Sequence, residues 1–196
     1  LLDAHSNKAQ HARPLNIGYL GRLVSSKGVP EIIEAVRLLR DRAIPVRLSI
    51  AGSGPIEASL REAAAKAQLT DRIVFRGALF GADKNAFWSE IDLFVFPTYH
   101  KEGLPYSLLE SMAAAAVPVI SPVGGIPDVV QDGVHGLFVP PRDPTALADL
   151  IARLDRDRTS IVQMATAGRQ RICEHYTIAR LGREFRRLYL DLNGGG

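Results

Sequence analysis

The sequence contains little of what disulfide-stabilised, secreted or membrane-spanning proteins require. Cys173 is the only cysteine among 196 residues, so no internal disulfide can form, and this usage is typical of a reducing compartment. No apolar run approaches the roughly 20 residues that cross a bilayer. Residues 1–14 lack both the apolar core of a secretory signal and an initiator methionine. We therefore expect a cytoplasmic piece of a longer chain, with membrane contact at most peripheral.

A strong charge imbalance is also missing. The net charge of +3 permits an anionic ligand, but it is weaker than the clustered basic excess that is typical of nucleic-acid-binding domains. Hydrophobic residues make up 46% of the chain, which is enough for a sizeable core, and the length suits one domain. We assign residues 15–192 to this domain, residues 1–14 to a linker and residues 193–196 to a flexible tail.

Short apolar segments alternate with helical patterns over most of the chain. Strands are predicted at 17–20, 46–51, 73–75, 93–96, 117–121 and 137–139. Helices are predicted between them, the first beginning near Val29 with Pro30 in its first turn, and others at about 55–69, 82–91 and 105–116. Nearly continuous apolar strands indicate parallel pairing with both faces covered. The sequence therefore predicts an α/β, Rossmann-like, doubly wound parallel sheet of six strands with helices on both faces.

The last third of the chain is predicted to be helical. Helical segments are expected at 143–157, 160–175 and 177–192, the first with Asp143 as its N-cap and Pro144 at its first position. In the last segment an apolar stripe is formed by Leu181, Phe185, Leu188, Tyr189 and Leu192. A closing helical tail without further strands could pack on a neighbouring domain.

Glycine-containing loops follow five of the predicted strands. They lie at 21–28, 52–55, 76–78, 97–103 and 122–125. In an open α/β sheet, ligands bind outside the carboxyl ends of the strands, where these loops are expected to meet. Each loop alone is an ordinary turn, but five on one edge favour a binding face, because glycine lets backbone approach a ligand closely.

The first of these loops carries two cations, Arg22 and Lys27, just before a predicted helix. A helix N-terminus offers free N–H groups to an anion, Arg adds a forked donor and Lys a mobile charge, so the loop suits a diphosphate. Two solvated surface cations are the alternative. The loop lacks the spacing of a Walker motif, and Gly52 and Gly54 are not followed by the third glycine of a dinucleotide fingerprint.

Two carboxylates follow the fourth predicted strand. Glu102 lies in the loop, and Glu110 falls in the second turn of a helix that is expected to start at Pro105. A carboxylate among apolar helix positions needs a partner. Near a diphosphate, both are suited to accept hydrogen bonds from vicinal hydroxyls of a ribose and a sugar. For Glu110, a salt bridge to a nearby cation is the alternative.

Taken together, these segments resemble family-four (group 1) retaining glycosyltransferases. Residues 21–28 are similar to the G-R-L-x-x-x-K-G loop of that family, and residues 102–110 match its E-x7-E signature. Further segments resemble family blocks in the same order, at 52–55, 73–77, 124–127 and 132–136. The resemblance covers about residues 15–192, and the ordered set makes it specific.

The resemblance implies a GT-B enzyme, in which two Rossmann-like domains enclose the active site. This chain matches only the C-terminal, donor-binding domain, so the N-terminal domain with most of the acceptor site is missing and the chain alone is expected to show little or no transfer. The implied reaction moves a sugar from a nucleoside-diphosphate sugar to a hydroxyl of a glycan, lipid or small molecule, with retention of anomeric configuration. No cofactor and no metal are implied, since two cations and a helix terminus can stabilise the departing diphosphate.

The resemblance also implies a set of donor-binding residues. They are Gly21, Arg22, Lys27, Arg76, Gly77, Ala78, Glu102, Gly103, Leu104 and Glu110. By analogy, Arg22 and Lys27 hold the diphosphate, Glu110 binds the ribose diol and Glu102 contacts the sugar. Arg22, Lys27 and Glu102 are the candidate catalytic residues. Residues 76–78 line the base pocket, and residues 103 and 104 offer backbone N–H groups.

Some positions depart from the family pattern or suggest other chemistry. Asp128 stands where the family usually has Glu, and Pro105 removes one backbone donor. Asp155 and Asp157 spell a D-x-D motif, but at a helix end among arginines, which predicts a solvated charge cluster and not a metal site. A nucleotide-sugar epimerase or hydrolase using Glu102 or His100, and a non-catalytic binding domain, remain alternative functions.

Overall fold

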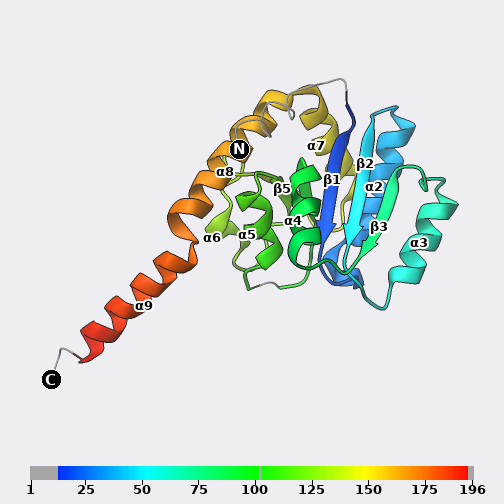
Figure 1. Ribbon diagram of the computed structural model, residues 1–196. Coiled ribbons are helices and arrows are strands. Elements are labelled where there is room, and N and C mark those ends of the chain that lie inside the picture. The colour runs from blue at the N-terminus through cyan, green and yellow to red at the C-terminus, as the bar shows by residue number, and fades with distance from the viewer. Residues whose placement is uncertain (1–12, 102, 194–196) are drawn as a thin grey trace.

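The computed structural model describes residues 13–101 and 103–193, and in this part of the chain the six strands form one parallel sheet with helices on both faces (Figure 1). The strands are β1 (Leu15–Leu20), β2 (Val46–Ala51), β3 (Ile73–Gly77), β4 (Leu93–Phe96), β5 (Val117–Ile120) and β6 (Leu137–Phe138). Their order is β3-β2-β1-β4-β5-β6, and every pairing is parallel. The strand order reverses between β1 and β4, which confirms the predicted doubly wound class and places the switch point at these two strands.

The central strands are apolar because both of their faces are covered. Every residue of β4 and β5 is buried, and β1 pairs along its whole length with β2, from Leu15 opposite Val46 to Leu20 opposite Ala51. These are the segments whose continuous apolar character predicted a parallel sheet. The six strands lie within two residues of their predicted bounds.

Helices connect the strands and cover the sheet on both faces. The structure contains α2 (Val29–Asp41), α3 (Glu57–Lys66), α4 (Gly81–Glu90), α5 (Tyr106–Ala113), α6 (Ile126–Val129), α7 (Pro144–Arg156), α8 (Arg158–His175) and α9 (Ile178–Asn193). α2 packs against α7 on one face of the sheet, and α5 packs against α8 on the other. A short 3-10 helix, η2 (Ser25–Lys27), and α6 were not predicted, because one turn leaves no periodic pattern.

The helix termini follow the local chemistry of their first residues. The Asp143 side chain accepts a hydrogen bond from the Ala146 N–H at 2.8 Å, which confirms it as the N-cap of α7. α5 begins one residue later than expected, at Tyr106. Pro105 keeps an extended backbone, with φ −66° and ψ 122°, and so serves as the preceding cap.

The closing helix α9 extends away from the body of the domain (Figure 1). Its apolar side chains Ile178, Leu181, Phe185 and Tyr189 are exposed, so the described part of the predicted stripe, at 181, 185 and 189, lies on the surface. Within the described residues, no helix combines the length and the apolar character that crossing a membrane requires.

The junction of α7 and α8 corrects one expectation. The charge cluster at 155–158 was predicted to be solvated, but the Arg158 side chain is only 1% exposed and forms an ion pair with Asp155. Asp157 accepts a hydrogen bond from the Ser160 N–H and caps α8. The arginine is buried because two helices pack closely at this sharp turn, which a one-dimensional charge pattern does not reveal.

An ion pair with a buried carboxylate joins the beginnings of β1 and β4. Arg13 Nη1 and Nη2 each donate to one oxygen of Asp92 at 2.7 Å, and the Asn16 N–H donates to the same carboxylate at 3.0 Å. Asp92 is 2% exposed, whereas Arg13 is partly exposed. The hydrogen bond to Asp92 raises the pKa of Arg13 above its usual value. Arg13, which lies in the stretch that the sequence assigns to a linker, thus contacts the domain tightly.

Replacing Arg13 with methionine is expected to lower the free energy of unfolding by about 3 kcal/mol, because the Asp92 carboxylate stays buried without its counter-ion. Urea denaturation followed by circular dichroism measures this change. Lys66→Met is the matched control, since its ion pair with Glu62 is exposed and should contribute less than about 1 kcal/mol. Equal effects of the two substitutions would contradict a structural role for Arg13.

Candidate functional site

The loops at the carboxyl edge of the sheet are joined to one another through backbone hydrogen bonds. The Gly52 N–H donates to the Gly77 carbonyl at 2.7 Å, which joins the loops after β2 and β3. The Leu23 N–H donates to the Ser53 carbonyl at 2.9 Å, which joins the loops after β1 and β2. The edge is therefore one connected surface and not a row of independent turns.

The same connection continues across the switch point. The Tyr99 N–H donates to the Ser26 carbonyl at 3.0 Å, so the loops after β1 and β4 meet. The Gly125 N–H donates to the Gly103 carbonyl at 3.0 Å, and this bond joins the loops after β4 and β5. All five loops that the sequence predicted at one edge are thus brought together.

Glycine is required where the first and fourth loops touch. Gly28 has φ 77°, and a Cβ at this position would lie 2.4 Å from the Pro97 carbonyl oxygen. Gly28 is also the N-cap of α2, and no side chain caps this helix. The first N–H groups of α2 therefore lie at the contact of the two loops, where they can donate to an anion.

The two predicted cations lie in this first loop. Arg22 is exposed, and within the described ranges its guanidinium forms no hydrogen bond or ion pair. Its carbonyl accepts a 2.7 Å hydrogen bond from the Tyr19 hydroxyl, which fixes the backbone of the loop. Lys27 ends the 3-10 helix, and its Nζ lies 5.6 Å from the centre of the Phe96 ring. Lys27 directly precedes Gly28, the N-cap of α2, and Arg22 lies exposed in the same loop.

The fourth loop carries the other predicted donor contacts. Glu102 lies outside the described residues, so its role stays a prediction. Gly103 and Leu104 are exposed at the edge, and Pro105 has no N–H to contribute, as the sequence indicated. The N-terminus of α5 has no side-chain cap either, which leaves its first N–H groups available.

Glu110 is held by two side-chain hydrogen bonds. Its Oε1 accepts a hydrogen bond from Lys84 Nζ at 2.6 Å, and its Oε2 accepts one from Trp88 Nε1 at 3.3 Å. The salt bridge that the sequence left as an alternative is therefore present. The Glu110 side chain is still 33% exposed, so the carboxylate remains accessible from the solvent side.

The predicted base-pocket residues lie at the outer end of the edge. Gly77 has φ 68°, and Ala78 is exposed. The Arg76 guanidinium forms an ion pair with Glu90 at 3.2 Å, and both side chains line a cavity of about 290 Å³ together with Leu79 and others. The structure thus places a concave surface beside these residues, while the Arg76 charge is already paired.

A row of aromatic rings underlies the site. Tyr19 and Phe96 stack with ring centres 5.8 Å apart, and Phe96 and Phe94 stack at 5.6 Å. Trp88 then meets Phe94 edge to face at 5.4 Å. The row thus extends from Phe96, which lies next to Lys27, to Trp88, which donates to Glu110.

Lys84 and Trp88 were not foreseen as part of the site. Trp88 is buried in the core, and its indole N–H also donates to Glu110. The two residues are four positions apart on α4, so they project from the same helix face. The sequence shows that spacing. It does not predict the ion pair with Glu110, because Lys84 and Glu110 are 26 positions apart in the chain.

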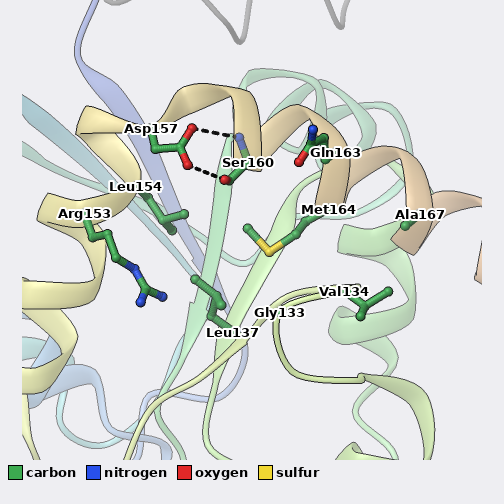
Figure 2. Close-up of a pocket in the computed structure, with 10 residues that line it drawn as sticks. All are labelled: Gly133, Val134, Leu137, Arg153, Leu154, Asp157, Ser160, Gln163, Met164 and Ala167. Atoms are coloured by element: carbon green, nitrogen blue, oxygen red, sulfur yellow. Dashed lines mark hydrogen bonds between the residues drawn. The ribbon is translucent and has the colours of Figure 1, made fainter.

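A cavity of about 550 Å³ lies away from this edge. It is bounded by the end of α7, the first half of α8 and the beginning of β6, at the amino ends of the strands (Figure 2). Leu137, Leu154 and Met164 contribute its apolar lining. Asp157 lies at its border but already caps α8 through Ser160, as the dashed lines show. It contains none of the predicted site residues.

Other polar residues have structural contacts. The His135 Nδ1 accepts a hydrogen bond from the Gln131 N–H, and burial together with Arg171 lowers the pKa of His135. The Asp128 carbonyl accepts hydrogen bonds from Arg171 and the Tyr176 hydroxyl, while its side chain faces solvent. Across the part of the chain that the structure describes, no three His, Cys, Asp or Glu residues are grouped so that they could hold a metal ion.

Comparison with known sequences identifies a family. A family model described as glycosyl transferases group 1 matches residues 14–157. The putative colanic acid biosynthesis glycosyltransferase WcaL of Salmonella typhimurium is 31% identical over 187 residues, which are 92% of this chain and 46% of that protein. The GDP-mannose-dependent alpha-(1-6)-phosphatidylinositol monomannoside mannosyltransferase of Mycobacterium tuberculosis is 35% identical over 158 residues, or 77% of this chain and 41% of that protein. The chain spans less than half the length of both relatives.

Solved structures share the fold. HepE of Anabaena in complex with UDP has a TM-score of 0.83 at 19% identity, and the match covers 96% of this chain and 53% of that one. The C-terminal domain of LpcC, a glycosyl transferase group 1 family protein from Francisella tularensis, has a TM-score of 0.75 at 23% identity, covering 90% of this chain and 92% of that domain. At these identities the likeness shows the architecture, and it agrees with the Rossmann-like class predicted from the sequence.

Proposed function

Since this chain belongs to the group 1 glycosyltransferase family, we propose that it binds the nucleoside-diphosphate part of a sugar donor at the carboxyl edge of its sheet. One observation carries this proposal, namely that Lys27 directly precedes the N-cap of α2, a helix without a side-chain cap, and that Arg22 lies exposed in the same loop. Two cations in the loop that leads to free helix N–H groups suit a diphosphate. The location also supports the proposal, because the switch point of an open sheet is where ligands bind.

The remaining site residues extend the proposal around the donor. Glu110 accepts hydrogen bonds from the ribose diol, and Glu102 contacts the transferred sugar beside the N–H groups of Gly103 and Leu104. Residues 76–78 border the base. HepE, which shares the fold, was crystallised in complex with UDP, and this supports a nucleotide donor for the present chain.

For the whole protein we propose transfer of the sugar to an acceptor hydroxyl, with retention of configuration and without a metal or cofactor. An N-terminal domain supplies most of the acceptor site, so this chain alone shows little or no turnover. The exposed apolar stripe of α9 offers a surface on which that domain packs. We place the protein in the cytoplasm, because a single cysteine fits a reducing compartment. An epimerase, a hydrolase or a non-catalytic domain is not favoured, since the relatives are named as glycosyltransferases.

Calorimetric titration of this chain with UDP, GDP and ADP in the presence of EDTA tests the proposal. We expect saturable binding of one nucleotide, with a dissociation constant that rises with salt, because the diphosphate contacts are ionic. The preferred nucleotide identifies the base of the donor. The absence of binding by all three at millimolar concentration, in EDTA and equally when a divalent metal replaces EDTA, would refute donor binding by this chain. Binding only with the metal would refute its metal independence.

A further inference from the structure

Two residues of α4 hold the Glu110 carboxylate from one side. Lys84 and Trp88 are four positions apart, so both side chains project from the same face of α4 toward α5. Each contacts a different oxygen, Lys84 Nζ at 2.6 Å from Oε1 and Trp88 Nε1 at 3.3 Å from Oε2. With one donor on each oxygen, the plane and the direction of the carboxylate are both determined.

The indole that takes part in this contact is itself immobilised. Trp88 is 4% exposed, and it meets Phe87 edge to face at 5.0 Å and Phe94 at 5.4 Å. Rotation of the indole would require both neighbouring rings to move, because side chains in a packed interior have little free space. The direction of its N–H is therefore fixed by the core, and the core in turn orients Glu110.

The arrangement leaves part of the Glu110 carboxylate available for a ligand. An ionised carboxylate can accept about four hydrogen bonds, and the two contacts from α4 leave about two acceptor positions. The side chain is 33% exposed, so these positions can be reached from the solvent. Lys84 also balances the negative charge of Glu110, which reduces its repulsion of a diphosphate held nearby.

We propose that Lys84 and Trp88 are positioning residues, which orient Glu110 toward the two hydroxyls of the ribose and so make the site selective for ribonucleotides over 2′-deoxyribonucleotides. The inference rests on the proposed binding of a nucleoside diphosphate at this edge. Neither residue needs to touch the nucleotide. A carboxylate whose direction is already fixed can accept hydrogen bonds from both hydroxyls of a diol. A mobile carboxylate binds the diol more weakly, because ordering its side chain on binding costs free energy.

Binding of ribose and 2′-deoxyribose forms of the same nucleotide separates this role from a general structural one. UDP, GDP and ADP are each titrated beside their 2′-deoxy forms into the unaltered chain, Lys84→Met, Lys84→Arg and Trp88→Phe. Lys66→Met is the matched control, because it removes a lysine from an exposed ion pair at the end of α3. Circular dichroism verifies that each variant is folded.

We expect the unaltered chain and Lys66→Met to bind the preferred ribonucleotide about tenfold more tightly than its 2′-deoxy form, as for a hydrogen bond to a charged group. Lys84→Met should bind both forms within about threefold of each other, since Glu110 is no longer held toward the diol. Lys84→Arg should restore the selectivity, and Trp88→Phe should retain part of it.

Three results would overturn the inference, each in a different way. If Lys84→Met keeps the full selectivity, Lys84 does not orient Glu110. If it weakens both forms equally, Lys84 contacts the diphosphate or the base directly. If the unaltered chain binds both forms with equal affinity, Glu110 does not hold the ribose. Failure of the unaltered chain to bind either form would refute the proposed function itself, and with it this inference.

Discussion

Replacing Arg22 and Lys27 together with alanine is expected to weaken nucleoside-diphosphate binding by roughly 100-fold or more, since each charge-assisted hydrogen bond contributes about 1.5–3 kcal/mol. Both residues lie in the loop that leads to the N-terminus of α2, and the guanidinium of Arg22 has no described partner to lose. The fold should therefore be retained while the diphosphate contacts disappear. Calorimetric titration with the preferred nucleotide measures the change.

A double variant that removes two positive charges elsewhere serves as the control. Arg47→Ala with Lys66→Ala changes the net charge by the same amount, and both residues are exposed away from the carboxyl edge. If attraction of the nucleotide depends only on the overall charge, both double variants will lose affinity equally. A loss confined to the Arg22 and Lys27 variant assigns the effect to the loop, whereas equal losses would contradict a specific diphosphate site.

Replacing Gly52 with alanine is expected to lower the free energy of unfolding by about 3–5 kcal/mol, because backbone strain and overpacking add. Gly52 has φ 132°, and a Cβ at this position would lie 1.8 Å from the Gly21 carbonyl oxygen. The loops after β1 and β2 would have to separate. Because the loop after β1 carries Arg22, nucleotide binding should weaken as well, and urea denaturation together with titration measures both effects.

Gly133→Ala is the matched control for this variant. Gly133 also has a positive φ, 74°, but a Cβ there would meet no atom within 4 Å. Gly133→Ala should lower the free energy of unfolding by only the roughly 1–2 kcal/mol that a left-handed backbone conformation costs a residue with a Cβ. If the two substitutions destabilise the chain equally, the close approach of the loops does not contribute to stability, and the connected edge described above would be wrong.

The sequence predicted most of the sheet because the signals for buried parallel strands are local. The segments at 46–51 and 93–96 are largely apolar and β-branched or aromatic in part, and each became a strand with the predicted bounds. The loops at the carboxyl edge could be placed for the same reason, since strand direction determines on which edge they lie. Helix ends such as Asp143 followed from capping chemistry, which also depends on a few adjacent residues.

The contacts that shape the site could not be predicted, because they join residues distant in sequence. The hydrogen bond between the Leu23 N–H and the Ser53 carbonyl depends on the alignment of two neighbouring strands. A pattern of residue types does not predict that alignment. The partnership of Lys84 with Glu110 depends on the packing of two helices. Arg158 was expected in solvent for the same reason, and tertiary packing placed it in the interior.

The aromatic row beneath the site gives the protein an optical property. Trp88 is the only tryptophan of the chain. Fluorescence that is excited at the long-wavelength edge of the near-ultraviolet absorption therefore comes from this one indole. Its N–H bonds to Glu110, and its ring is held between Phe87 and Phe94. On the proposed binding of the ribose diol by Glu110, the charge distribution next to the indole changes, and we expect the emission wavelength of Trp88 to shift. Trp88 would then act as an intrinsic fluorescent sensor of nucleotide binding, which needs no attached dye.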